Sequence, residues 1–288
     1  MSIITPETHQ EDSDGTIWLH VEKTLYCLPR GMLQMHSEIF ASIFPMPGQG
    51  GDQAEDPVIL ESILSKEFDY LARYLFVGPH IARWESPPPY ENAMLISLLR
   101  LGDLYEMEKV RTFAKYHITS QTSISPAQKI SLARMYTIPE WVEPAVKLLV
   151  HIGLLGITDE DTTYLGLVTY RILARAQAEI GRARLCLSLA TPPAVCDEHC
   201  GRGFTCGTAW KEFWWTKVRR WLNHLHNPPH ISNLCDHVDS IFPVIGMDWA
   251  CQEKTITNLR GMTALRVEDE ITEAAVKAVL DYNRSLEL

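Results

Sequence analysis

The stretch Tyr26-Cys-Leu-Pro-Arg-Gly-Met-Leu-Gln-Met-His-Ser-Glu-Ile-Phe40 predicts a strand end, a helix, a cap and a second helix in quick succession. Pro29 stands where the first helical turn tolerates a missing N–H, and Ser37 is of a type that caps helices. Upstream, apolar and more polar residues alternate over 16–21, and a short turn leads into 24–28. The sequence therefore predicts a β-hairpin followed by two short helices.

The residues after this stretch predict one more strand, further helices and two exposed loops. Gly, Pro and acidic residues at 45–56 predict a loop, and residues 58–60 predict a short buried strand. Ser65 opens a segment with apolar residues at helical spacing, and the same spacing returns over 94–111. The proline-containing tract between them, at 80–90, predicts a stiff surface loop.

Taken together, these motifs resemble a BTB/POZ domain over residues 14–120. That family opens with an aromatic residue, then His-Arg three residues on, then Leu, Ser and Phe; these places are held here by Tyr26, Pro29-Arg30, Leu33, Ser37 and Phe40. Pro29 replaces the family's His. The resemblance implies an α+β fold in which helical hairpins flank a small sheet. It also implies a homodimer surface at the first helices, for which the candidate residues are Arg30, Met32, Leu33, Met35, Ser37 and Phe40.

Residues 121–288 show helical patterns without strand signals, so we expect a mainly α-helical C-terminal domain. Helix starts are predicted at Pro126, Pro139 and Thr158, and a further helix is predicted from Gly166 to Ile180. A BTB-like region followed by short paired helices, with an Ile-Pro-Glu-Trp turn at 138–141, resembles the members of this superfamily that are multiplied in mushroom-forming fungi. The polar, acidic residues 1–13 are expected to form a flexible arm.

Composition narrows the class of protein. The 288 residues are enough for two domains, and a hydrophobic content of 46% is enough to build their cores. The formal charge of -10 argues against general binding of nucleic acid, although it leaves room for a local basic face. Seven irregularly spaced cysteines without an apolar leader favour a reduced protein of the cytoplasm or nucleus. The most apolar run, at 145–157, is too short to cross a membrane, so no span is expected.

A Cys-rich loop is predicted at 192–208, where Cys196, Cys200 and Cys206 lie close together in the sequence. Thiolates at such spacing can surround a zinc ion and fix a loop that has no core of its own. We take these three cysteines as candidate ligands; the candidates for the fourth are His199, Cys235 and His237. The alternative is a set of free or partly buried thiols.

Aromatic and basic residues are interleaved over 210–221, a pattern that by itself suggests stacking on nucleic-acid bases. On a helix, however, Trp210, Trp214 and Val218 share one stripe, while Arg219 and Arg220 fall elsewhere. We interpret this segment as a helix with one buried and one solvated face.

Enzyme motifs are absent from the sequence: it has no phosphate loop, no Gly-x-Ser-x-Gly elbow and no His-Glu-x-x-His. No catalytic residue is predicted. The leading hypothesis is a non-enzymatic interaction adaptor that dimerises and holds a client, in the manner of family members that act as substrate adaptors for cullin-type ubiquitin ligases. One alternative is a nuclear regulatory or nucleic-acid-associated protein that uses the Cys-rich loop and the Trp/Arg helix. The other is an enzyme with an unrecognised site.

Overall fold

The computed structural model describes residues 3–4, 15–44, 50–77, 90–201, 203–224 and 228–286. Over these residues the chain is mostly helical with one small sheet, which confirms the predicted α+β class. It divides into two compact units, Met1–Ser125 and Pro126–Leu288, where the sequence had suggested a boundary at 120. Nearly all of the predicted arm at 1–13 and of the proline-containing tract at 80–90 lies outside the described residues.

The sheet of the first unit is built on the predicted hairpin. Strand β2 (Thr16–Val21) pairs antiparallel with β3 (Thr24–Pro29), with Leu19 opposite Tyr26. The short strands β1 (Ile3–Ile4) and β4 (Val58–Ile59) add in parallel at the two edges, which gives the order β1-β3-β2-β4. Along β2, every second side chain is buried because successive side chains of a strand point to opposite faces. The alternation read from the sequence is therefore the inner face of this sheet.

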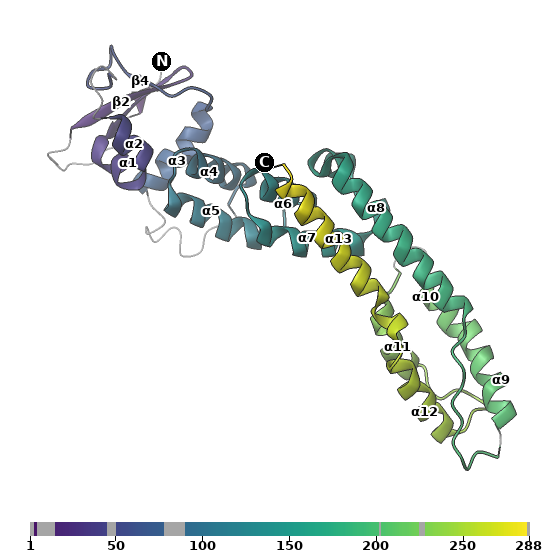
Figure 1. Ribbon diagram of the computed structural model, residues 1–288. Coiled ribbons are helices and arrows are strands. Elements are labelled where there is room, and N and C mark those ends of the chain that lie inside the picture. Colours follow the sequence, from purple (N-terminus) through teal and green to yellow (C-terminus); the bar gives the residue numbers. More distant parts are fainter. Residues whose placement is uncertain are drawn as a thin grey trace. The chain divides into compact units, whose positions relative to one another are not determined.

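Five helices complete the first unit (Figure 1): α1 (Arg30–His36), α2 (Glu38–Ile43), α3 (Ser65–Val77), α4 (Asn92–Leu104) and α5 (Glu108–Ser120). Polar contacts fix α3 against the hairpin. The Glu22 carboxylate accepts hydrogen bonds from the Ser65 N–H and hydroxyl, at 2.8 and 2.9 Å, and the Tyr26 hydroxyl donates to Asp69 at 2.7 Å. Helices α4 and α5 approach closely at Gly102, where a Cβ atom would lie 2.9 Å from the Arg111 backbone nitrogen.

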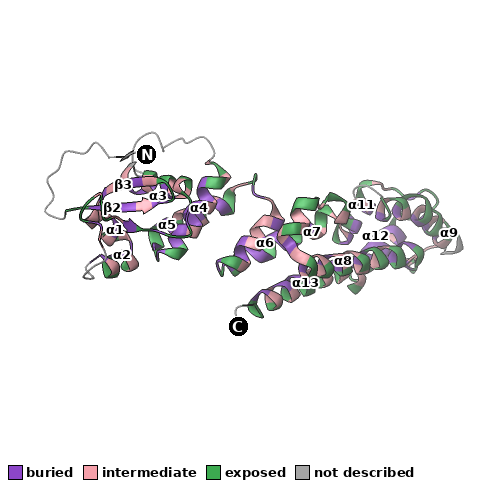
Figure 2. Ribbon diagram, turned by 90° about the horizontal axis from the view of Figure 1, so that it is seen from above, coloured by how far each residue is buried: buried purple, intermediate pink, exposed green. Residues whose placement is uncertain are grey.

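The second unit is entirely helical in its described residues. Its elements are α6 (Pro126–Met135), η2 (Pro139–Trp141), α7 (Val142–Ile152), η3 (Leu154–Gly156), α8 (Asp159–Leu189), α9 (Gly203–Phe213), η4 (Trp214–Val218), α10 (Arg219–Leu222), η5 (Ile231–Asn233), α11 (Leu234–Ser240), α12 (Trp249–Arg260), η6 (Thr263–Arg266) and α13 (Val267–Arg284). The long helices α8 and α13 lie side by side, and α6 and α7 pack against them (Figure 1). Figure 2 shows that buried residues follow the inner sides of these helices.

Helix α8 forms where the sequence predicted two elements. Thr158 and Asp161 form a reciprocal capping box at its start, with hydrogen bonds of 3.1 Å in each direction, which satisfies otherwise unpaired backbone N–H groups. Gly166 interrupts the helix with a φ of 69°, a conformation that glycine adopts without the steric cost of a Cβ atom. The chain therefore continues through a kink rather than through a loop.

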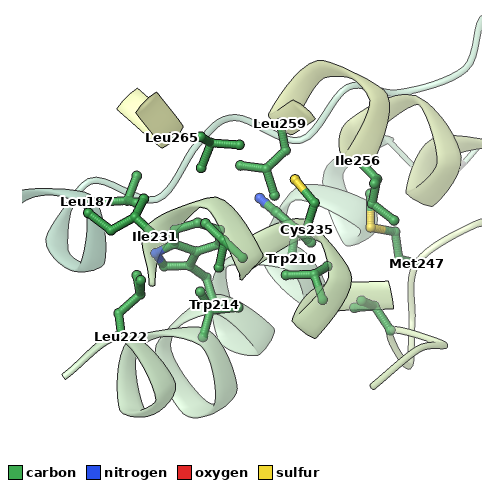
Figure 3. Close-up of a cluster of buried hydrophobic side chains, with 14 of the residues drawn as sticks. Leu187, Trp210, Trp214, Leu222, Ile231, Cys235, Met247, Ile256, Leu259 and Leu265 are labelled. Carbon is green, nitrogen blue, oxygen red and sulfur yellow. The ribbon is translucent and has the colours of Figure 1, made fainter. Parts of the chain in front are cut away.

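A hydrophobic cluster fills the part of the second unit that is formed by the end of α8 and by the elements from α9 to η6 (Figure 3). Trp210 and Trp214 lie at its centre, and both are fully buried, together with residues of α8, α11 and α12. The buried stripe of the α9–η4–α10 segment has a constant spacing of four residues: Cys206, Trp210, Trp214, Val218 and Leu222. In an α-helix, each step of four residues rotates the stripe by about 40°. The π-helical turn η4 is wider than an α-helical turn, so it offsets this rotation and keeps the stripe on one core.

Candidate metal centre

Four cysteines converge at the end of this hydrophobic cluster. The sulfur atoms of Cys196, Cys200, Cys206 and Cys251 all lie within 4.8 Å of one another, and those of Cys200 and Cys206 are 3.7 Å apart. Cys206 and Cys251 are buried, whereas Cys196 and Cys200 lie nearer the surface. Three segments, namely the loop after α8 and the first turns of α9 and α12, thus bring ligand atoms close together.

The elements that carry these cysteines explain why they meet. Cys206 is in the first turn of α9 and Cys251 is in the first turn of α12, and both helices bury one face in the same core. Cys196 and Cys200 lie on the loop after α8, which hydrogen bonds hold down at two points: Trp210 Nε1 donates to the Pro192 carbonyl at 2.8 Å, and Val195 N donates to Thr255 Oγ1 at 2.9 Å.

Backbone N–H groups point at two of the sulfur atoms. The Asp197 N–H donates to Cys251 Sγ at 3.2 Å, and the Asp248 N–H donates to Cys206 Sγ at 3.4 Å. The Asp197 carboxylate in turn receives Lys254 Nζ at 2.7 Å. That contact, with the N–H of His199, holds the pKa of Asp197 at about 2, so the carboxylate stays ionised and its loop stays tied to α12. These contacts form an outer shell that orients the thiols.

Two of the thiols are poorer acids in this setting than an ordinary cysteine. Burial away from water raises the pKa of Cys251 to about 12 and also raises the pKa of Cys196. At neutral pH and without an ion, Cys196 and Cys251 would therefore be neutral thiols. A bound cation reverses this preference because a thiol that coordinates a metal loses its proton.

The structure brings together Cys196, Cys200 and Cys206, which the sequence predicts as ligands, but the fourth residue differs from the prediction. The fourth cysteine is Cys251, and none of the three candidates named for that place belongs to the cluster. The His199 side chain is 94% exposed and faces Asp197. Cys235 is buried in the hydrophobic cluster, and His237 stacks on Trp221 with ring centres 4.4 Å apart. The predicted Cys-rich loop is also shorter than 192–208, since α9 already begins at Gly203.

The candidate interaction residues of the first unit fall into two groups. Leu33, Ser37 and Phe40 are buried. Ser37 caps α2 by accepting from Phe40 N at 3.1 Å, and it donates to the Tyr105 carbonyl at 2.6 Å. On the outer side of α1, Met35 is 68% exposed and Met32 is half-buried. Arg30 is half-buried and pairs with Asp52.

The segment that interleaves aromatic and basic residues has the expected two faces. Trp210, Trp214 and Val218 are buried, and Arg220 is exposed. Trp215 differs from its tryptophan neighbours because it is 47% exposed, with the Arg219 guanidinium 4.2 Å from its ring centre.

In the part of the chain that the structure describes, no helix has both the length and the apolar character needed to cross a bilayer. Comparison of the sequence and structure with known protein families, with curated proteins and with solved structures gave no match.

Proposed function

We propose that this chain is a non-enzymatic interaction adaptor whose helical unit is fastened by a structural zinc ion. The ligands are Cys196, Cys200, Cys206 and Cys251. The observation that carries the zinc site is the convergence of four sulfur atoms, from a loop and two helices, within 4.8 Å of one another.

The size and chemistry of the cluster suit zinc. Zinc binds thiolates at about 2.3 Å in a tetrahedron, which places neighbouring sulfur atoms about 3.8 Å apart. Cys200 and Cys206 are already 3.7 Å apart, and the other pairs need to move inward by about 1 Å at most to reach this separation. Four soft ligands without carboxylate or imidazole favour zinc over calcium or magnesium, and iron is the metal that shares this preference.

The ligand set also indicates a structural role. Catalytic zinc sites keep one position open for water or substrate, whereas sites with four protein ligands are closed. Here all four positions would be taken by cysteines. The ion would join the loop after α8 to the first turns of α9 and α12, and so would hold the end of the hydrophobic cluster together.

Metal analysis of purified protein tests the site. We expect one zinc per chain after expression without added metal, and less than half of that in Cys251→Ser. Cys235→Ser is the matched control, since Cys235 is also a buried cysteine on a helix but lies outside the cluster. Equal zinc in the two variants, or no zinc in the parent protein, would contradict the assignment.

The adaptor role rests on the first unit. A β-hairpin, two short helices, an edge strand and further helices follow one another in the order of a BTB/POZ domain, which supports the resemblance. We propose that α1 contributes to a homodimer surface, with Met35 as the exposed apolar anchor. A cullin scaffold is the partner that the resemblance suggests.

Light scattering coupled to size exclusion tests the dimer. We expect a dimer at micromolar concentration and a monomer for Met35→Glu. Met135→Glu is the control because Met135 is 63% exposed on α6 in the other unit. A parent protein that is monomeric, or two variants with equal mass, would refute the α1 surface. Binding of purified cullin that is retained in Met35→Glu would show that cullin binding does not require dimerisation.

A further inference from the structure

Positive charge is concentrated in one part of this acidic chain. Residues 162–224 hold nine basic and four acidic residues, a formal charge of +5. Because the whole chain carries -10, the rest of the chain carries -15. This segment comprises most of α8, the loop that follows it, and the α9–η4–α10 helix. Of these basic residues, Arg184 has a side chain that is only 14% exposed and is paired with Glu268, so the charge that could attract an acidic partner is that of the exposed residues.

On α8 the charge lies along a single stripe. The outer stripe of α8 consists of Arg171, Arg175, Ala178, Arg182, Leu185 and Leu189, at alternating spacings of four and three residues, and all six are exposed. The residues two positions earlier at each step, such as Thr169, Leu173 and Ile180, face the core. Two residues correspond to about 200° around a helix, so the outer stripe points directly away from the core.

The outer stripe of α8 has no partner for most of its charge. In the described part of the chain, Arg171 and Arg182 lie within ion-pair distance of no carboxylate. Arg175 pairs with Glu179 at 2.9 Å, but this is a solvent-exposed pair within one helix and holds the arginine only weakly. At the other end of the stripe, the side chains of Leu185 and Leu189 are about half exposed. One face of α8 therefore presents arginines followed by leucines over about 27 Å.

The segment formed by η4 and α10 also carries exposed basic and aromatic side chains. Segments η4 and α10 pack against α8, and Figure 1 shows the two helical stretches running alongside each other. Lys217 and Arg220 of this segment are exposed. Trp215 is exposed as well, and the Arg219 guanidinium lies over its ring in a cation–π contact. Exposed basic side chains thus occur both on α8 and on the segment that packs against it.

We propose that the outer stripe of α8 is the docking surface for an acidic, amphipathic helix of a client protein. The alternation of four and three residues is the spacing at which one helix packs along another. The three arginines would face Asp or Glu of the client, and Leu185 and Leu189 would receive its apolar residues. This inference rests on the proposed adaptor role and names the chemistry of the client.

The leucines decide between an acidic protein segment and nucleic acid. A nucleic-acid strand needs cations along its whole backbone and aromatic rings for its bases. The outer stripe offers cations over only part of its length and aliphatic side chains over the rest, which matches a helix that has both carboxylates and apolar residues.

A peptide-display selection on the full-length protein as purified tests the proposal. The probe is a library of 21-residue helical peptides with random residues along one face. We expect enrichment of Asp, Glu, Leu and Phe at four-and-three spacing. In fluorescence anisotropy, Arg171→Glu/Arg182→Glu should weaken a selected peptide by about tenfold or more, and Leu185→Ser/Leu189→Ser should weaken it comparably.

A charge-matched control is Lys23→Glu/Lys277→Glu, which reverses two exposed lysines elsewhere and should leave affinity unchanged. Far-UV circular dichroism and the urea unfolding midpoint of each variant establish that it is folded. Selected peptides without acidic residues, affinities insensitive to the arginine reversals, or arginine-dependent binding of a dT20 oligonucleotide or phosphatidylserine vesicles in place of peptides would overturn the proposal. The zinc and dimer tests involve other residues, so their failure and the failure of this surface are distinguishable.

Discussion

Glu268→Gln is expected to destabilise the helical unit by about 3 kcal/mol. The Glu268 carboxylate joins three elements: from α13 it receives Arg184 of α8 at 2.5 Å and the Ile231 N–H of η5 at 2.9 Å. The two charged side chains are only 6% and 14% exposed. Removing one partner of a buried ion pair costs about 3–5 kcal/mol because the other charge stays buried without compensation. Glutamine keeps a hydrogen-bond acceptor, so the lower end of this range applies.

Urea unfolding followed by tryptophan fluorescence measures this effect, since Trp210 and Trp214 lie in the core beside this contact. With a slope of roughly 2 kcal/mol per molar urea, a loss of about 3 kcal/mol lowers the midpoint by about 1.5 M. The control is Glu143→Gln, which removes an exposed pair with Lys147 within α7 and should cost less than about 0.5 kcal/mol. Equal midpoints for the two variants would refute the reasoning.

Three further outcomes follow from other contacts. Trp214→Ala should lower the free energy of unfolding by about 3–5 kcal/mol in the same assay, whereas the exposed Trp215→Ala should cost under about 1 kcal/mol; similar losses would contradict the buried stripe. Ser37→Ala removes the cap of α2 and its buried bond to Tyr105, so thermal unfolding of the first unit should show a loss of about 1–2 kcal/mol. Because burial raises the pKa of Cys251 above that of an ordinary thiol, zinc must displace protons, and competition with a chelator should show affinity falling as pH falls from 8 to 6; an affinity independent of pH would exclude thiol ligands.

Local periodicity was enough to predict much of this fold. The alternation over 16–21 becomes β2 and the turn after it becomes the hairpin, because strand pairing follows directly from two adjacent apolar runs. The stripe of Trp210, Trp214 and Val218 likewise becomes a buried helix face. In each of these cases the periodicity that predicts the element lies within one short segment of the sequence.

The fourth cysteine could not be predicted in the same way. Cys251 reaches the cluster because α12 and α9 pack into one core, and no local spacing links it to Cys206. The sequence signal for Cys251 is its place in the first turn of a helix that Asp248 caps, which resembles the place of Cys206 in α9. The continuity of α8 through Gly166 was missed for a related reason, since a glycine can end a helix or kink it depending on what packs around it.

X-ray absorption at the zinc K-edge of the purified full-length protein is the most direct test of the four-cysteine zinc site. We expect a first coordination shell of four sulfur atoms at about 2.3 Å, with no nitrogen or oxygen ligand. A shell that contains nitrogen or oxygen, or a preparation without zinc, would contradict a site built from Cys196, Cys200, Cys206 and Cys251.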